Sequence, residues 1–371
     1  MNNVLALVDL YDQNNLGLLT KERPLASTTF LGRYAFIDFV LSNLTNSGID
    51  NIGILVKEHV NNIHKHILFP NTYLTNPKTG FLSFLINEKG IINPVYNTDV
   101  NNIKENDFVL FDVNTKYIIV TNSSIVSKTD YREIMNEHIK SGKLCSLVYK
   151  KVEHSNEFRN SYKVVSDNLN CVQKLYKDMN DEPANVLLNT LIIDKELFIN
   201  MLKKSNELSV VYSIEDMVNY IVNYVTKVNL IEFKGIALCF DSLEKYFKCS
   251  LDFLSNPMLL KDFFDDENWS FYTTTHNSRP VLHGEHAVVE NSLIANGSTI
   301  EGTVKNSIIC RDVTIEEGAT VENSIIFTHC VIKAGTHIKN VIADKRVHFV
   351  EKKEIIGDEN KPLYFPRGVN V

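Results

Sequence analysis

The stretch VENSLI (289–294) recurs three times further along the chain, as VKNSII (304–309), VENSII (321–326) and IKNVIA (338–343). The spacings are 15, 17 and 17 residues, with Val or Ile at every fifth or sixth position. Such a period is typical of a β-solenoid, in which the apolar rows of each coil stack on the next coil. Gly297, Gly318 and Gly335 precede strands, where a corner requires a permissive backbone. We therefore predict a left-handed parallel β-helix of the hexapeptide type over residues 280–371.

The chain up to residue 240 has a different pattern, because short apolar runs alternate with amphipathic stretches. The predicted strands cover residues 3–10, 52–56, 116–122, 144–152 and 189–195. The predicted helices cover residues 37–48, 130–143 and 213–225. Strand–helix–strand order predicts a mostly parallel mixed sheet with helices on both faces, as in a Rossmann-like α/β domain. Residues 241–279 are predicted to be a helical connector and linker, with an amphipathic helix over 242–254.

Capping residues support these helix predictions. Gly48 and Gly142 lie where two of the helices should stop. Asp130 is a suitable N-cap for the second helix, and Ser213 with Asp216 forms the pattern of a capping box for the third.

Composition excludes several classes of function. The chain has 371 residues and a net charge of −7, which disfavours nucleic acid as the main partner because phosphate binding requires a basic surface. No apolar run is long enough to cross a membrane, so no membrane partner is expected. The six cysteines lie far apart without a CxxC pair. This spacing predicts buried thiols in a reduced, cytoplasmic protein rather than a zinc site or a disulfide set.

The stretch FLGRYAFIDFVLSNLTNSGIDNIGI (30–54) resembles a signature of the glucose-1-phosphate adenylyltransferases, the ADP-glucose pyrophosphorylases of bacterial glycogen synthesis. The resemblance implies a nucleotidyltransferase-like domain followed by a left-handed β-helix, which agrees with the two patterns above. The matching positions that we interpret as structural are Gly32, Arg33, Asp38, Ser42, Asn43 and Gly48.

The nucleotide-binding loop departs from the family pattern. Catalytic members carry G-G-x-G-T-R-L ahead of the signature, and the corresponding loop here includes Tyr11, Asp12, Gln13, Asn14 and Asn15. Glycines allow backbone N–H groups to approach a triphosphate closely, and cations neutralise the departing pyrophosphate. This loop supplies bulk and a negative charge instead, which predicts a degenerate nucleotide loop.

The metal and sugar-phosphate motifs are also altered. Ser123 occupies the position of the family's magnesium-binding aspartate, and a serine hydroxyl is a poor Mg²⁺ ligand. Four other residues match family site positions and are interpreted as remnants of substrate binding, namely Arg23, Lys177, Asp216 and Asp241. We predict no catalytic residue, no metal ligand and no tightly bound cofactor in this chain. Mg²⁺ would be needed only by a catalytic partner.

An intact scaffold with an altered site resembles the divergent subunit that Gram-positive bacteria pair with a catalytic pyrophosphorylase. The resemblance implies a regulatory, catalytically inactive subunit in glycogen biosynthesis. Its partner would be the catalytic glucose-1-phosphate adenylyltransferase subunit in a heterotetramer, with a homo-oligomer when the chain is alone.

Three alternatives stay open. The chain could be a weakly active adenylyltransferase with an altered loop, or a stand-alone sensor of sugar phosphate. It could also be a hexapeptide acyltransferase, which would need a catalytic histidine such as His329 or His337 in a longer solenoid. The histidines at 59, 64 and 66 form a candidate metal cluster, which the spacing disfavours because His64 and His66 would point to different faces of a helix.

Overall fold

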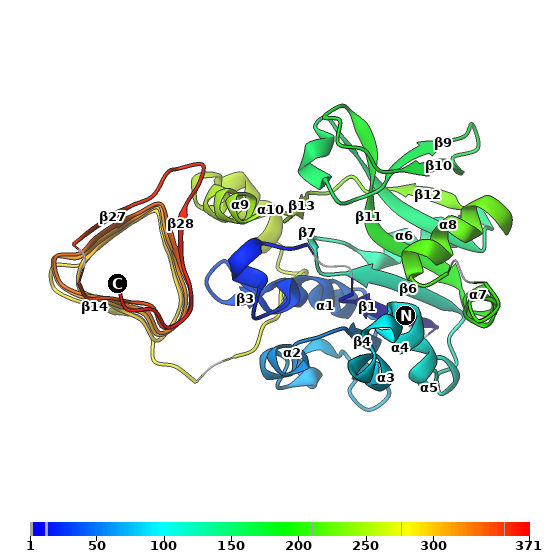
Figure 1. Ribbon diagram of the computed structural model, residues 1–371, viewed down its shortest axis with the longest axis horizontal. Helices are drawn as coiled ribbons and strands as arrows, with labels where there is room; N and C mark the ends of the chain where they lie inside the picture. The colour runs from blue at the N-terminus through cyan, green and yellow to red at the C-terminus, as the bar shows by residue number, and fades with distance from the viewer. Residues whose placement is uncertain (1–2, 12–13, 209–210, 276, 352) are drawn as a thin grey trace. The chain divides into compact units, whose positions relative to one another are not determined.

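The computed structural model describes residues 3–11, 14–208, 211–275, 277–351 and 353–371 (Figure 1). The chain divides into two compact units. The first contains residues 1–14 and 37–239, and the second contains residues 15–36 and 240–371. The segment 15–36 therefore packs with the C-terminal part of the chain, although it lies between two pieces of the first unit.

The first unit is built on one mixed sheet of nine described strands. They are β1 (Val4–Asp9), β4 (Asn51–Val56), β5 (Phe81–Ile86), β6 (Tyr117–Asn122), β8 (Cys145–Val152), β9 (Lys163–Ser166), β10 (Val172–Tyr176), β11 (Ala184–Asp194) and β12 (Asn229–Glu232). β1 lies between β4 and β6 and is parallel to both, whereas β11 is antiparallel to β6 and β8. This arrangement confirms the predicted mostly parallel mixed sheet. A two-stranded ribbon of β7 (Ile125–Ser127) and β13 (Ala237–Cys239) was not predicted.

Helices pack on this sheet. They are α1 (Phe36–Asn46), α2 (Val60–His66), α3 (Glu88–Ile92), α4 (Asp99–Glu105), α5 (Phe108–Phe111), α6 (Tyr131–Ser141), α7 (Lys195–Lys204) and α8 (Ile214–Tyr224). α4 contacts β4 and β5, α6 contacts β8 and β12, and α7 contacts β6 and β11. The short 3₁₀ helices of this unit are η3 (Pro70–Tyr73), η4 (Pro94–Tyr96) and η5 (Ser155–Phe158).

The predicted caps are present. Asp130 accepts a hydrogen bond from the N–H of Arg132 at the start of α6, and Gly142 ends that helix with φ +64°. Gly48 follows α1 with φ +71°, a conformation that glycine adopts without strain. Ser213 and Asp216 form a reciprocal capping box at the start of α8.

The second unit contains a parallel β-helix of three five-stranded sheets, whose triangular coils are visible in Figure 1. The sheets are β14-β17-β20-β23-β26, β15-β18-β21-β24-β27 and β16-β19-β22-β25-β28. Their strands are β14 (Leu282–His283), β15 (Val288–Glu290), β16 (Leu293–Ile294), β17 (Thr299–Ile300), β18 (Thr303–Lys305), β19 (Ile308–Ile309), β20 (Thr314–Ile315), β21 (Thr320–Glu322), β22 (Ile325–Ile326), β23 (Val331–Ile332), β24 (His337–Lys339), β25 (Val341–Ala343), β26 (His348–Phe349), β27 (Glu354–Ile356) and β28 (Leu363–Phe365).

The register of the coils confirms the sequence repeat. Val289 pairs with Val304, which pairs with Val321, which pairs with Ile338. The three later residues are fully buried and form one apolar column inside the solenoid. Asn291 and its equivalents at 306, 323 and 340 occupy one corner, all with φ between +43° and +53°. These left-handed asparagines were not predicted, although the sequence repeats them in four successive coils.

The rest of the second unit is helical and aromatic. α9 (Leu243–Ser255) confirms the predicted amphipathic helix, and α10 (Pro257–Phe264) follows it. The segment 15–36 contributes η1 (Gly17–Thr20), η2 (Leu25–Ser27) and the hairpin β2 (Thr29–Phe30)–β3 (Tyr34–Ala35). The Phe30 ring contacts the rings of Phe36, Phe240 and Phe253 at centroid distances of 5.1 to 5.6 Å. This aromatic cluster holds the segment against α9.

The longest described helix, α9, has 13 residues. A bilayer span needs about 20. None of the helices in the described ranges could therefore cross a membrane.

Candidate functional site

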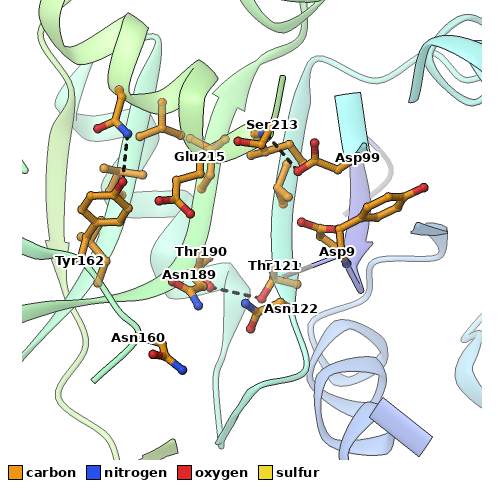
Figure 2. Close-up of a pocket in the computed structure, with 18 of the residues that line it drawn as sticks. Asp9, Asp99, Thr121, Asn122, Asn160, Tyr162, Asn189, Thr190, Ser213 and Glu215 are labelled. Atoms are coloured by element: carbon orange, nitrogen blue, oxygen red, sulfur yellow. Dashed lines mark hydrogen bonds between the residues drawn. The ribbon is translucent and has the colours of Figure 1, made fainter. Parts of the chain in front are cut away.

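A pocket of about 350 Å³ lies in the first unit at the carboxyl ends of β1 and β6 (Figure 2). β1 ends at Asp9 and β6 ends at Asn122, and these two residues are paired in register. The chain leaves β1 toward β4 on one side and returns through β6 on the other side. Such a switch point is where open α/β sheets bind ligands, because loops diverge there and leave a crevice. The pocket is therefore the candidate functional site.

The polar wall of this pocket is rich in amides and carboxylates. Its polar and charged side chains among the described residues are Asp9, Tyr11, Lys57, Asn97, Thr98, Asp99, Thr121, Asn122, Asn160, Tyr162, Lys177, Asn189, Thr190, Ser213, Glu215 and Asn219. They include three carboxylates and two lysines, and no arginine lines the described wall. Apolar side chains of β6, β8, β10, β11 and α8 complete the lining. The carboxylates outnumber the lysines by one, so the described wall carries a small formal negative charge.

Tyr11 lies directly after β1, in the region that carries glycines in the family. Its hydroxyl donates a hydrogen bond to Asn97 Oδ1 at 2.9 Å and accepts one from Asn102 Nδ2 at 3.0 Å. Burial, and to a smaller extent the charges of Asp9 and Asp99, raises the pKa of Tyr11 to about 12. The ring is thus tied into the pocket wall and stays uncharged at neutral pH.

The other residues of the predicted nucleotide loop do not form one site with Tyr11 in the described structure. Asp12 and Gln13 lie outside the described residues. Asn14 belongs to the first unit, where its Oδ1 accepts a hydrogen bond from Asn160 Nδ2 at 2.6 Å. Asn15 belongs to the second unit and accepts from the N–H of Gly17 at 2.8 Å. Neither asparagine lines the pocket.

Lys177, which stands at the lysine position of the family's sugar-phosphate motif, lies in the pocket wall. Its Nζ is 2.9 Å from Glu215 Oε1 and 4.2 Å from the centre of the Tyr162 ring. Figure 2 shows Glu215 between Tyr162 and Asp99. Glu215 therefore offsets the charge that Lys177 could offer to a phosphate.

Asp216 does not line the pocket, although it is adjacent to Glu215. Its Oδ2 accepts hydrogen bonds from the N–H groups of Tyr212 and Ser213 at 3.1 and 3.0 Å. Asp99 also serves this helix, because its Oδ2 accepts from the N–H of Ile214 at 3.0 Å. A carboxylate at a helix N-terminus satisfies donors that have no partner within the helix. Asp216 thus has a structural role in the described contacts.

Arg23 and Asp241 belong to the second unit, and each forms an ion pair with a different residue of that unit. The guanidinium of Arg23 forms a buried ion pair with Asp344 and lies 5.8 Å from the centre of the Phe327 ring. Asp241 is nearly buried just before α9, and its Oδ2 lies 3.4 Å from Nζ of Lys245 in the first turn of that helix. Both side chains have ionic partners that stabilise the unit.

The position that binds magnesium in the family carries a serine in this chain. Ser123, at the position of the family's metal aspartate, is buried and does not line the pocket. Its hydroxyl has no hydrogen-bond partner in the described part of the chain. No group of three His, Cys, Asp or Glu side chains in the described ranges is placed to bind a metal. The histidine cluster is separated as well, because His66 contacts Asp38 and His64 packs near Phe84.

The signature residues hold the scaffold. Asp38 is fully buried and accepts a hydrogen bond from Tyr73 at 2.7 Å, with His66 Nε2 at 2.6 Å. Asn43 Nδ2 donates to the carbonyl of Ser127 at 2.8 Å, and the neighbouring Ser42 is also buried.

Gly32 and Arg33 form the turn of the β2–β3 hairpin in the second unit. Gly32 has φ +80°, and a Cβ there would lie 3.4 Å from the carbonyl oxygen of Ile309. Arg33 Nη2 donates to the hydroxyl of Tyr34 at 2.7 Å.

Asn189 is a pocket residue that the sequence did not indicate. It lies in β11, where the register with β8 shifts between Leu187 and Leu191, and its φ is +50°. A bulge of this kind can direct a side chain into a site. The only signal in the sequence was an asparagine within an apolar strand, which is too weak to identify a site residue.

Comparisons with known proteins match two different families, one in the N-terminal half of the chain and one near its C-terminus. The nucleotidyl transferase family model matches residues 16–168, and the GlmU-like C-terminal hexapeptide model matches residues 279–362. The chain is similar to the glucose-1-phosphate adenylyltransferase of Fervidobacterium nodosum, with 27% identity over 328 residues, 86% of this chain and 77% of the relative. The same-named protein of Bacillus cereus is 26% identical over 313 residues, 82% of each chain. That of Bacillus cytotoxicus is 25% identical over 358 residues, 93% of this chain and 92% of the relative.

Proposed function

We propose that this homologue of the glucose-1-phosphate adenylyltransferases is a regulatory, catalytically inactive subunit that acts by binding a catalytic subunit of the same family. The enzyme would convert ATP and glucose 1-phosphate to ADP-glucose and pyrophosphate in glycogen biosynthesis, in the cytoplasm. The observation that carries the proposal is the position of Tyr11. Its side chain is hydrogen-bonded into the pocket wall directly after β1, where nucleotidyl transfer would need an open, glycine-lined phosphate cradle.

The electrostatics of the pocket support this proposal. Enzymes lower reaction barriers by roughly 8 kcal/mol or more, and phosphoryl-type transfer obtains most of that from positioned cations and metal ions. Here three carboxylates line the wall, and Lys177 is paired with Glu215. Arg23 is paired with Asp344 in the second unit. A triphosphate would meet repulsion without the compensating contacts.

An intact scaffold combined with an altered pocket supports the proposed regulatory role. The mixed sheet, the hydrogen bond of the signature residue Asn43 and the β-helix are all present in the structure. A subunit of this kind would shift the active–inactive equilibrium of its partner, typically by about 1–3 kcal/mol. We propose a heterotetramer of the two kinds of chain.

Co-expression with a catalytic homologue that has the intact glycine-rich loop tests the proposal. We expect the two chains to co-elute in size-exclusion chromatography and the kinetics or effector response of the catalytic chain to change at least fivefold. Two separate peaks with unchanged kinetics would refute the regulatory role.

A second candidate is a weakly active adenylyltransferase. The pocket at the switch point favours it, because the cavity is open and Lys177 still lines it. Pyrophosphate release by the purified chain alone, from ATP and glucose 1-phosphate, distinguishes the two. We expect no pyrophosphate release above background from the wild-type chain or from Lys177→Ala. If release were measured, activity of this chain would disappear in Lys177→Ala, whereas activity of a contaminating enzyme would be unaffected.

A further inference from the structure

We propose that the pocket binds an uncharged, hexose-sized polyol without a phosphate group, and that Asn189 is its main recognition residue. This inference rests on the proposed loss of catalysis, since a catalytic site of this family would have to bind phosphates. It assigns a ligand class to a pocket that the proposed function leaves without a substrate.

The first argument is charge. The described wall carries Asp9, Asp99 and Glu215 against Lys57 and Lys177, a formal balance of −1. The ammonium of Lys177 already has a carboxylate 2.9 Å away. A phosphate monoester would bring further negative charge next to these carboxylates. A neutral ligand avoids that repulsion and can still donate hydroxyl hydrogens to carboxylate oxygens.

The second argument is the pattern of unused hydrogen-bonding groups. The amides at 122, 160 and 189 line the pocket from β6, the loop after η5 and β11. Asn122 uses its Oδ1 to accept from Ser124, and Asn160 uses its Nδ2 to donate to Asn14. Their opposite amide atoms, a donor and an acceptor, make no hydrogen bond with the described residues. Hydroxyl groups both donate and accept, so a polyol matches such a mixed set.

The third argument is the backbone of Asn189. The side chain makes no hydrogen bond with the described residues, and both its donor and its acceptor groups are therefore available. The residue is held at φ +50° at the bulge in β11, a left-handed conformation that asparagine adopts more readily than most residues. A bulge of this kind can direct a side chain into a site. Figure 2 shows Asn189 among the pocket residues, beside Thr190.

The fourth argument is size. A volume of about 350 Å³ is near the lower end of the range of roughly 300–1,000 Å³ that is typical of small-molecule pockets. A single sugar ring fits this volume better than a nucleotide sugar. Leu147, Leu187 and Val218 provide apolar contacts for the C–H groups of such a ring.

The test is ligand binding by the full chain, measured by saturation-transfer NMR and isothermal titration calorimetry. D-glucose is the probe, and glucose 1-phosphate, adenosine and ATP are the comparison ligands. We expect D-glucose to bind at least tenfold more tightly than glucose 1-phosphate and no binding of ATP. Tighter binding of glucose 1-phosphate, binding of adenosine alone, or no binding of any probe would each overturn the proposal.

Asn189→Gly tests the recognition residue without disturbing the backbone, because glycine adopts a positive φ without strain. We expect D-glucose affinity to fall at least tenfold while the melting temperature is unchanged or higher. Asn291→Gly is the matched control, since it makes the same substitution at φ +43° in the β-helix and should leave affinity unchanged. Unaltered affinity in Asn189→Gly would refute the role of Asn189. These outcomes are independent of the catalytic partner, so they can fail while the regulatory role holds.

Discussion

Arg23 and Asp344 form an ion pair within the second unit, and both side chains are almost completely buried. The two residues are 321 positions apart in the sequence. Tyr364 adds a hydrogen bond from its hydroxyl to Asp344 Oδ2 at 2.8 Å. The one arginine that the loop region shares with the family motif therefore joins the segment 15–36 to the last coils of the β-helix.

Asp344→Ala should destabilise the protein by about 3–5 kcal/mol, because it leaves the Arg23 charge buried without its partner. Urea unfolding followed by circular dichroism measures the loss. The double variant Arg23→Met/Asp344→Leu should be less destabilised than Asp344→Ala, since it removes both charges. Lys305→Ala is the control, because it breaks an exposed pair with Glu290 and should cost at most about 1 kcal/mol. An equal cost for Asp344→Ala and Lys305→Ala would contradict the role of the buried pair.

Asp216→Ala should lower the free energy of unfolding by about 1 kcal/mol, because the capping box at the start of α8 is lost. The neighbouring variant Glu215→Ala removes only a half-exposed ion pair with Lys177, and its effect on stability should be smaller. Ligand affinity should change more in Glu215→Ala than in Asp216→Ala, because Glu215 lines the pocket and Asp216 does not. Loss of ligand binding in Asp216→Ala at unchanged stability would indicate a binding role for Asp216 instead.

Tyr11 should make stability depend on alkaline pH. Its pKa is raised from 10.0 to about 12 in the folded protein, so between these values the unfolded chain loses the phenol proton while the folded chain retains it. The unfolded state then binds fewer protons, and stability falls as the pH rises from 10 to 12. Below pH 10 both states are protonated, and this contribution to stability is fully present.

Tyr11→Phe tests this dependence. At neutral pH it should cost about 1 kcal/mol, because the hydrogen bonds to Asn97 and Asn102 are lost. Between pH 10 and 12 its stability should fall less steeply than that of the wild type in urea titrations at fixed pH. Tyr224→Phe, at a largely exposed tyrosine, should follow the wild-type curve. Identical slopes for Tyr11→Phe and the wild type would mean that the Tyr11 phenol is not shielded from water.

The parts of the fold that local patterns determine could be predicted from the sequence. The spacing of VENSLI and its repeats gave the register of the β-helix, because each coil pairs with equivalent residues of the next. Asp130 and Gly142 marked the ends of α6, because capping depends on neighbouring residues.

Long-range contacts could not be predicted in this way. The ion pair of Arg23 and the packing of 15–36 on α9 depend on side chains from distant parts of the chain. The direction of Asn189 depends on a bulge whose cause is the pairing of β11 with β8. Lys177 was found through the family motif, but its pairing with Glu215 required the structure.

The asparagine corner of the β-helix gives a prediction about how the coils are stabilised. Asn323 has φ +43°, and asparagine and glycine adopt this conformation far more readily than other residues. Asn323→Ala should therefore destabilise the protein by roughly 1–2 kcal/mol, whereas Asn323→Gly should change stability by less than about 0.5 kcal/mol. Urea unfolding of the two variants in parallel measures the difference. Equal losses would show that the amide group, and not the backbone conformation, determines the choice of asparagine at this corner.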